Sequence, residues 1–224
     1  MTLSIADIRA RVIPGYASAS PVERALAWAR PSICPFHLLA DAVPEATPSG
    51  LDIGCGTGLF LNTLATWNRI EHGLGVDLST RAVASANTAA AALGLDQNVQ
   101  FLEHNLADGL PAGSFDLVSM IDVMHHIPPA TQLNALREAA DKVADGGLLV
   151  YKDMVSRPLW RASANRLHDL VLARQWIHYL PMTAVVETLE GMGFTVEQRR
   201  RVNMWWYGHE WVVLRKNEAA RHST

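Results

Sequence analysis

The chain has 224 residues, of which 49% are hydrophobic and 18% are charged, and its formal net charge is −3. This length allows one α/β domain with a complete core, and the composition excludes a disordered chain. The slightly negative charge gives no electrostatic footprint for nucleic acid, so no nucleic-acid partner is expected. No stretch has the length and apolarity of a spanning helix, so no stable membrane insertion is expected either.

Cysteine usage and the first residues bear on the compartment. Cys34 and Cys55 have no zinc-type spacing, and two thiols do not make a disulfide framework. The first residues include Asp7 and Arg9 and lack the uninterrupted apolar core of a signal peptide. The sequence therefore predicts a reduced, cytoplasmic protein with no metal site, and the charge balance suits a small-molecule substrate.

The N-terminal part of the chain has no strand signal. Its apolar spacing predicts one or two helices, the clearest over Val22–Asp41. We expect residues 1–44 to form a helical N-terminal cap on a domain of residues 45–224.

Beyond residue 44, short apolar runs alternate with helical patterns. Five runs are predicted strands: Ser49–Ile53, Gly73–Val76, Val99–Leu102, Phe115–Ile121 and Gly147–Lys152. Three segments between them are predicted helices: Leu59–Trp67, Thr80–Leu93 and Ala130–Val143. Such alternation is typical of βαβ crossovers and predicts a parallel sheet with both faces covered.

The last third of the chain returns to a helical pattern before it ends in strands. Residues 157–191 read as helical with a break at Pro181, which predicts a helical cap insertion over about 155–192. Two strand candidates follow, Phe194–Arg201 and Glu210–Lys216, and a closing β-hairpin explains them.

The segment Leu51–Gly58 follows a predicted strand and opens a predicted helix. Gly54, Gly56 and Gly58 let the chain turn sharply and let a ligand approach the backbone, and the helix start offers unpaired N–H groups. Asp77 ends the next strand, where a carboxylate accepts both hydroxyls of a ribose. A nucleotide-type cofactor is therefore predicted at this turn.

These segments together resemble the class I S-adenosylmethionine-dependent methyltransferases. The similar segments are Leu51–Gly58 for the first family motif, Val76–Ser79 for the second, His104–Ala107 for the third, Phe115–Val118 with Asp122–Pro128 for the fourth, and Ala144–Leu149 before the fifth strand. The resemblance implies a Rossmann-like, mostly parallel seven-stranded sheet with an antiparallel last strand, flanked by helices.

The resemblance also implies S-adenosyl-L-methionine as the cofactor. The residues that it assigns to cofactor binding are Asp52, Gly54, Cys55, Gly56, Gly58, Asp77, Leu78, Asn105, Leu106 and Asp122. Asn105 departs from the family, which commonly has an aspartate there that accepts from the adenine amino group; the amide oxygen accepts the same bond. For Asp122, holding the cofactor's amino group and capping a turn are equal alternatives.

The candidate catalytic residues are His126, Asp153 and His168. A histidine after the end of a strand titrates near neutral pH, so His126 is a candidate general base, although packing of the site is the alternative. Asp153 follows the fifth strand, where a solvated loop acid is the alternative. His168 lies in the cap insertion, either over the cofactor's methyl group or on a solvated face.

The expected activity is methylation of an oxygen on a small aromatic or lipid-like molecule of secondary metabolism. The alternatives are an NAD-linked oxidoreductase that uses the same glycine loop, a tRNA or protein methyltransferase, and a non-catalytic binding protein on this scaffold. The aromatic residues of the hairpin predict core packing, a substrate wall or the interface of a homodimer, and they are Trp205, Trp206, Tyr207 and Trp211.

Overall fold

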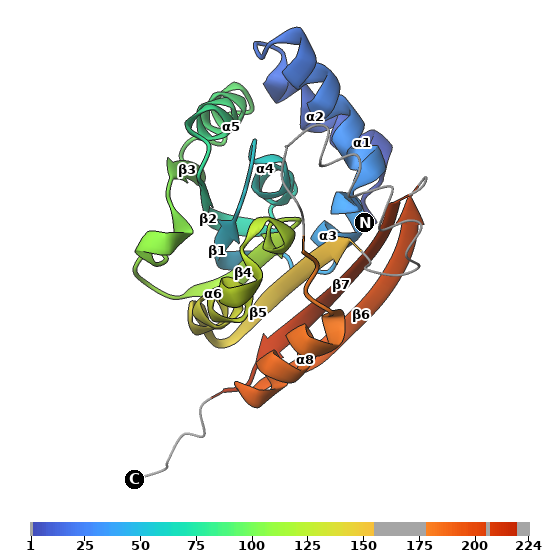
Figure 1. Ribbon diagram of the computed structural model, residues 1–224. Coiled ribbons are helices and arrows are strands. Elements are labelled where there is room, and N and C mark those ends of the chain that lie inside the picture. Colours follow the sequence, from blue (N-terminus) through green and yellow to red (C-terminus); the bar gives the residue numbers. More distant parts are fainter. Residues whose placement is uncertain (1, 155–177, 205–206, 219–224) are drawn as a thin grey trace.

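A computed structural model describes residues 2–154, 178–204 and 207–218, and it contains one seven-stranded sheet with the order β3-β2-β1-β4-β5-β7-β6 (Figure 1). The strands are β1 Thr47–Ile53, β2 Ile70–Asp77, β3 Val99–Glu103, β4 Phe115–Ile121, β5 Val143–Met154, β6 Phe194–Met204 and β7 Tyr207–Lys216. Strand β7 is antiparallel to both β5 and β6, and the other pairings are parallel. The predicted mostly parallel sheet with an antiparallel last strand is confirmed.

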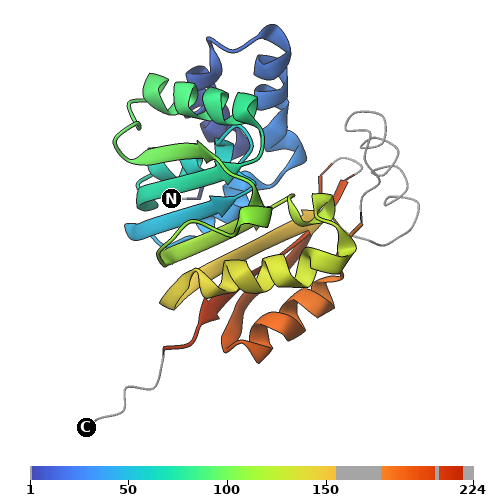
Figure 2. The same cartoon turned by 60° about the vertical axis from the view of Figure 1, so that its left-hand side comes forward.

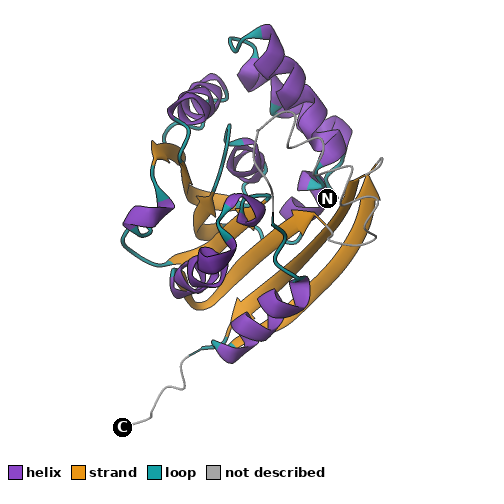
Figure 3. Cartoon of the chain, viewed as in Figure 1, coloured by secondary structure: helices purple, strands orange, loops and turns teal. Residues whose placement is uncertain are grey.

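Helices cover both faces of the sheet (Figures 2 and 3). They are α4 Leu59–Thr66, α5 Thr80–Ala92, α6 Pro129–Asp141 and α8 Met182–Gly191. Alternate residues of β5 face opposite layers: Leu148 and Val150 pack in the core with α4 and α5, whereas Leu149 and Tyr151 pack in the core with α6 and α8. Because both faces are buried, the centre of β5, Leu148–Tyr151, is a continuous apolar run rather than an alternating one.

The N-terminal residues form α1 Ile5–Arg11, a 3-10 turn η1 Ile13–Tyr16, α2 Pro21–Ile33 and α3 Phe36–Asp41. The prediction of one continuous helix over Val22–Asp41 is wrong, because the chain is extended at Cys34, with φ −135° and ψ 131°. Pro35 follows, and a proline disfavours the helical conformation of the residue before it. The helical segment therefore turns at this point, and α3 packs against α4.

The hairpin of β6 and β7 is longer than predicted. Cross-strand ion pairs connect Arg199 with Glu210 and Arg215 with Glu197. Trp211 on β7 is 1% exposed, so this tryptophan belongs to the core. Helix α8 begins after Pro181, as the break there predicts; the earlier part of the cap insertion, residues 155–177, lies outside the described residues. None of the described helices is long and apolar enough to cross a membrane.

Candidate active site

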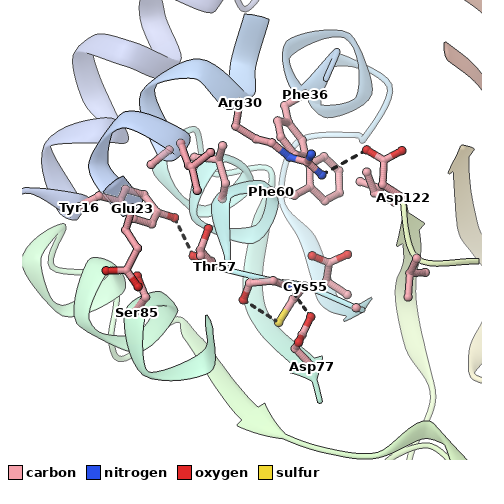
Figure 4. A pocket seen from close by; sticks show the side chains of 18 of the residues that line it. Tyr16, Glu23, Arg30, Phe36, Cys55, Thr57, Phe60, Asp77, Ser85 and Asp122 are labelled. Atoms are coloured by element: carbon pink, nitrogen blue, oxygen red, sulfur yellow. Dashed lines mark hydrogen bonds and ion pairs between the residues drawn. The ribbon is translucent and has the colours of Figure 1, made fainter. Parts of the chain in front are cut away.

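The carboxyl ends of β1, β2 and β4 lie at one edge of the sheet and border a cavity of about 450 Å³ (Figure 4). Parallel strands of an open α/β sheet present their ligand sites at this edge. The N-terminal helices complete the wall, since α2 and α3 contribute Glu23, Arg30 and Phe36. In Figure 4 Asp77 lies at one end of the cavity, and Arg30 and Asp122 lie at the other.

The glycine turn after β1 forms the floor of the cavity. Gly54 has a φ of +73°, and a Cβ atom there would lie 2.4 Å from Val123 Cγ2, so only glycine fits. Gly56 has a φ of +54°, but a Cβ atom on it would meet nothing within 4 Å. Gly56 therefore opens into free space, where a ligand can approach the backbone.

Asp77 is fixed beside this turn by two backbone hydrogen bonds. Its Oδ2 accepts from Gly56 N at 2.8 Å, and its Oδ1 accepts from Ser79 N at 2.9 Å. The carboxylate still lines the cavity. The next residue, Leu78, has an exposed side chain, with 68% of its surface accessible.

Asp52 is a second acid at this end of the cavity. Its Oδ1 accepts from Ser119 Oγ at 2.6 Å, and the residue is 3% exposed. Burial and then the negative charge of Asp77 raise the pKa of Asp52 to about 7, against the opposing Ser119 hydrogen bond. Burial also raises the pKa of the Cys55 thiol, which stays neutral at the same turn.

The opposite end of the cavity is organised by Asp122, a non-glycine residue with a φ of +56°. Lys152, whose side chain is fully buried, donates to Asp122 Oδ1, and Arg30 Nη2 lies 3.2 Å from Asp122 Oδ2. Burial favours the neutral acid, but the Lys152 and Arg30 charges outweigh it and lower the pKa of Asp122. This three-residue ion-pair group joins α2 to the ends of β4 and β5.

The histidines that follow β4 lie next to this group. His126 lines the cavity and is exposed. Its ring centroid is 4.2 Å from that of the buried His125, whose Nδ1 lies 2.6 Å from Asp153 Oδ1. Asp153 is 3% exposed and is not among the cavity-lining residues. His168 lies outside the described residues.

The predicted adenine-side residues follow β3, beside the cavity rather than in its wall. Asn105 Oδ1 accepts from Ala107 N at 3.0 Å and caps a 3-10 turn, η2 Leu106–Asp108. Leu106 is partly buried and packs against the core under α6. Neither Asn105 nor Leu106 is among the residues that line the cavity.

Several cavity residues come from the N-terminal helices and were not among the predicted site residues. Tyr16 donates to Thr57 O at 2.8 Å, and Glu23 lies 2.8 Å from Arg81 on α5. Arg30 reaches Asp122 at one end of the cavity. A sequence signal existed: Glu23 and Arg30 are seven residues apart, so they share one face of a helix.

Asp122, His125 and Asp153 each place one potential metal-ligand atom within 4.8 Å of the others. Lys152 and Arg30 already balance the charge of Asp122, and His125 is paired with Asp153. These internal pairs explain how the acids are accommodated at low exposure.

Residues 22–199 match a family model described as a methyltransferase domain. The chain belongs to this family, the class I S-adenosylmethionine-dependent methyltransferases. It is 33% identical over 127 residues to the 27-O-demethylrifamycin SV methyltransferase of Amycolatopsis mediterranei, which covers 54% of this chain and 44% of that protein. The matches span 34% to 44% of the length of the first curated relatives.

Two solved structures have the same fold as this methyltransferase. An O-methyltransferase family protein from Burkholderia thailandensis gives a TM-score of 0.70 at 20% identity, covering 88% of this chain and 59% of that one. The N-methyltransferase NodS from Bradyrhizobium japonicum in complex with S-adenosyl-l-homocysteine gives 0.60 at 18% identity, covering 96% and 98%. The cofactor of the family is S-adenosylmethionine, and the open Gly56 backbone beside a fixed carboxylate fits such a ligand.

Proposed function

We propose that this methyltransferase transfers a methyl group from S-adenosylmethionine to an oxygen of a small aromatic or lipid-like molecule of secondary metabolism. The observation that carries the proposal is the distribution of charge in the cavity: Asp52 and Asp77 lie beside the glycine turn, and the one arginine of the described lining pairs with Asp122 at the far end. The relative named for 27-O-demethylrifamycin SV supports an oxygen acceptor.

In this proposal the acids at the glycine turn select a cationic cofactor. S-Adenosylmethionine carries a sulfonium and an ammonium group, and Asp77 and the ionised form of Asp52 provide negative potential at the turn, whereas Glu23 is paired with Arg81. A dinucleotide would bring a pyrophosphate to the same turn, where these acids repel it. The NAD-linked alternative therefore lacks electrostatic support, although the glycine turn alone would accept either ligand.

The predicted cofactor residues divide into groups with different tasks. Asp77 binds the ribose hydroxyls, and the backbone of Gly54, Cys55, Gly56 and Gly58 borders the remainder of the nucleoside. Leu78, Asn105 and Leu106 lie on the adenine side. Asp122 is paired with Lys152 and Arg30, so acidic and basic groups lie next to each other at this end. We propose that Asp52 and Asp122 face the cofactor's ammonium group and that Arg30 faces its carboxylate.

When bound, the cofactor supplies a methyl group that is already electrophilic, so the chain mainly positions the acceptor and excludes water. Phe36 and Phe60 provide an apolar wall next to Arg30 (Figure 4). We propose His126 as the base that removes the acceptor's hydroxyl proton. Asp153 acts through His125, which packs against the His126 ring. His168 stays a proposed catalytic residue.

We also propose that residues 1–44 and the insertion over about 155–192 act as caps above the cavity and that the enzyme works in the cytoplasm. The lining contributed by α2 and α3 supports the first cap. A homodimer through the hairpin is the oligomeric alternative to a monomer, and light scattering of the purified chain distinguishes the two.

Calorimetry with S-adenosylhomocysteine and with NAD tests the cofactor, and only the former should bind. Turnover is then measured with a panel of phenols, hydroxylated lipids, amines and a tRNA pool; methylation of amines or tRNA alone would contradict the oxygen assignment.

Replacing His126 by Gln should lower kcat more than tenfold and remove the acidic limb of the pH profile if this residue is the base. An unchanged profile would contradict its role.

A further inference from the structure

Helix α2 directs two charged side chains toward the active-site cavity and three large apolar side chains toward its outer side. Glu23 and Arg30 point to the cavity, where they pair with Arg81 and Asp122. Val22, Leu26 and Trp28 are 68%, 62% and 55% exposed. Large exposed apolar side chains are unusual when they gather on one element, and these three lie within seven residues.

Small residues complete this outer face. At 100° per residue Ala25 and Ala29 fall between Trp28 and Val22 on the helical wheel, and Ala25 is exposed. We refer to Val22, Ala25, Leu26, Trp28 and Ala29 as the outer face of α2. Leu26 also lines the active-site cavity, so this face is continuous with the entrance to the site.

A second cavity, of about 490 Å³, lies beside the outer face, between α2 and the η1 turn, and we refer to it as the Arg9–Arg24 groove. Arg9, Arg24 and Trp28 line it together with apolar residues of both elements, and none of the described lining residues is acidic. The Arg9 guanidinium is held 3.8 Å from the centroid of the Trp28 ring and donates to Ser32 Oγ at 2.7 Å. Arg24 is exposed and has no ion-pair partner among the described residues.

We propose that the outer face of α2 and the Arg9–Arg24 groove dock the protein on the surface of an anionic lipid bilayer. Interfacial helices bury aliphatic and tryptophan side chains at the boundary of headgroups and acyl chains, with arginines at their edges. The groove supplies positive charge for lipid phosphates, although the net charge of the chain is −3.

The dimensions of α2 argue against a second copy of the chain as the occupant. Helix α2 has 13 residues, so it is about 20 Å long, and a face about 10 Å wide would bury about 200 Å² on each partner. Stable interfaces bury about 800 Å² on each partner. A bilayer surface has no such minimum, because charge and insertion of a few side chains add to one another. Docking also places the Leu26 entrance at the membrane, where a lipid-like acceptor enters directly.

The proposal is tested by co-sedimentation of the full chain with vesicles of phosphatidylcholine, with or without phosphatidylglycerol. The protein should bind the anionic vesicles, release them in high salt and bind the neutral ones weakly. Replacing Arg24 by Glu changes the local charge by two units, and at about fivefold in affinity for each charge near the surface the loss should be about 30-fold. Val22→Asp should cause a loss of at least this size.

Two matched controls carry the same chemical changes elsewhere: Leu102→Asp on the edge strand β3 and Arg137→Glu on α6. Both should keep vesicle affinity. All four variants are checked for folding by circular dichroism, and the vesicle assay needs no turnover, so its outcome is independent of the acceptor. Equal losses in controls and α2 variants would overturn the proposal. So would absence of binding to anionic vesicles, full competition by soluble glycerol 3-phosphate, or a dimer in light scattering that Val22→Asp dissociates.

Discussion

The two ends of the active-site cavity are built in different ways. At the cofactor end, the backbone makes the site: a glycine turn after β1 and the Asp77 carboxylate fixed by Gly56 N and Ser79 N. At the far end, side chains from distant segments make it, since Arg30 lies on α2, Asp122 follows β4 and Lys152 lies on β5. The first arrangement uses residues that are close in sequence and can therefore be predicted from it. The second arrangement exists only after the sheet has formed.

The largest expected effect is on the far end. Lys152→Met leaves the buried Asp122 carboxylate with Arg30 alone, and removal of one partner of a buried ion pair costs about 3–5 kcal/mol of the free energy of unfolding. Urea denaturation measures this loss. The same change at the partly exposed Lys142 should cost less than about 0.5 kcal/mol. Adding Asp122→Asn to Lys152→Met should recover part of the stability; a further additive loss would show that the pair is not coupled.

The second expected effect is on the cofactor end. Asp77→Ala removes the carboxylate proposed to bind the ribose, and the loss of charged hydrogen bonds should weaken S-adenosylhomocysteine binding about 100-fold, or about 3 kcal/mol. Isothermal calorimetry measures it, with Asp116→Ala at the opposite ends of the strands as a control on a similar part-buried acid. Unchanged affinity in Asp77→Ala would contradict the cofactor assignment.

The third prediction concerns pH. Asp52 has a pKa of about 7, raised above its unfolded value, so the ligand-free folded protein holds this proton below pH 7 and this contribution to stability is lost as pH rises from about 4 to 7. A cationic cofactor favours the ionised form, so its affinity should rise with pH up to about 7, by at most about tenfold per unit. Asp52→Asn should flatten the dependence measured by calorimetry; a slope that persists in this variant would assign it to another group.

The smallest effect is expected at the exposed ion pair between α2 and α5. Arg81 has a side chain that is 76% exposed, and removing its contact with Glu23 by Arg81→Ala should change stability by less than about 1 kcal/mol. Thermal unfolding measures this. A larger loss would mean that attachment of α2 depends on this contact rather than on Tyr16 and Arg30. The cofactor end of the cavity would then also depend on side chains from distant segments.

The sequence predicted the fold well, because buried parallel strands and their crossover helices are continuous local patterns. It also directed attention to Gly54, Gly56 and Asp77, which line the cavity, whereas their role in cofactor binding stays a prediction. It did not predict Tyr16, Glu23 or Arg30 as cavity residues, since their partners lie between 41 and 92 positions away. The turn at Cys34 was missed because two prolines in this segment behave differently. Pro31 lies inside α2, whereas Pro35 follows the end of this helix, and the apolar spacing alone does not distinguish them.

The order of the strands has a consequence for synthesis of the chain. Strand β7 follows β6 in sequence but lies between β5 and β6 in the sheet. While the ribosome is still making residues 207–216, the long edge of β5 therefore has no neighbour on that side, and its backbone groups stay open to pairing with other chains. The hairpin is a local contact and forms quickly once β7 emerges. We therefore expect nascent chains halted before β7 to aggregate, and release of ten further residues to complete the sheet in one step.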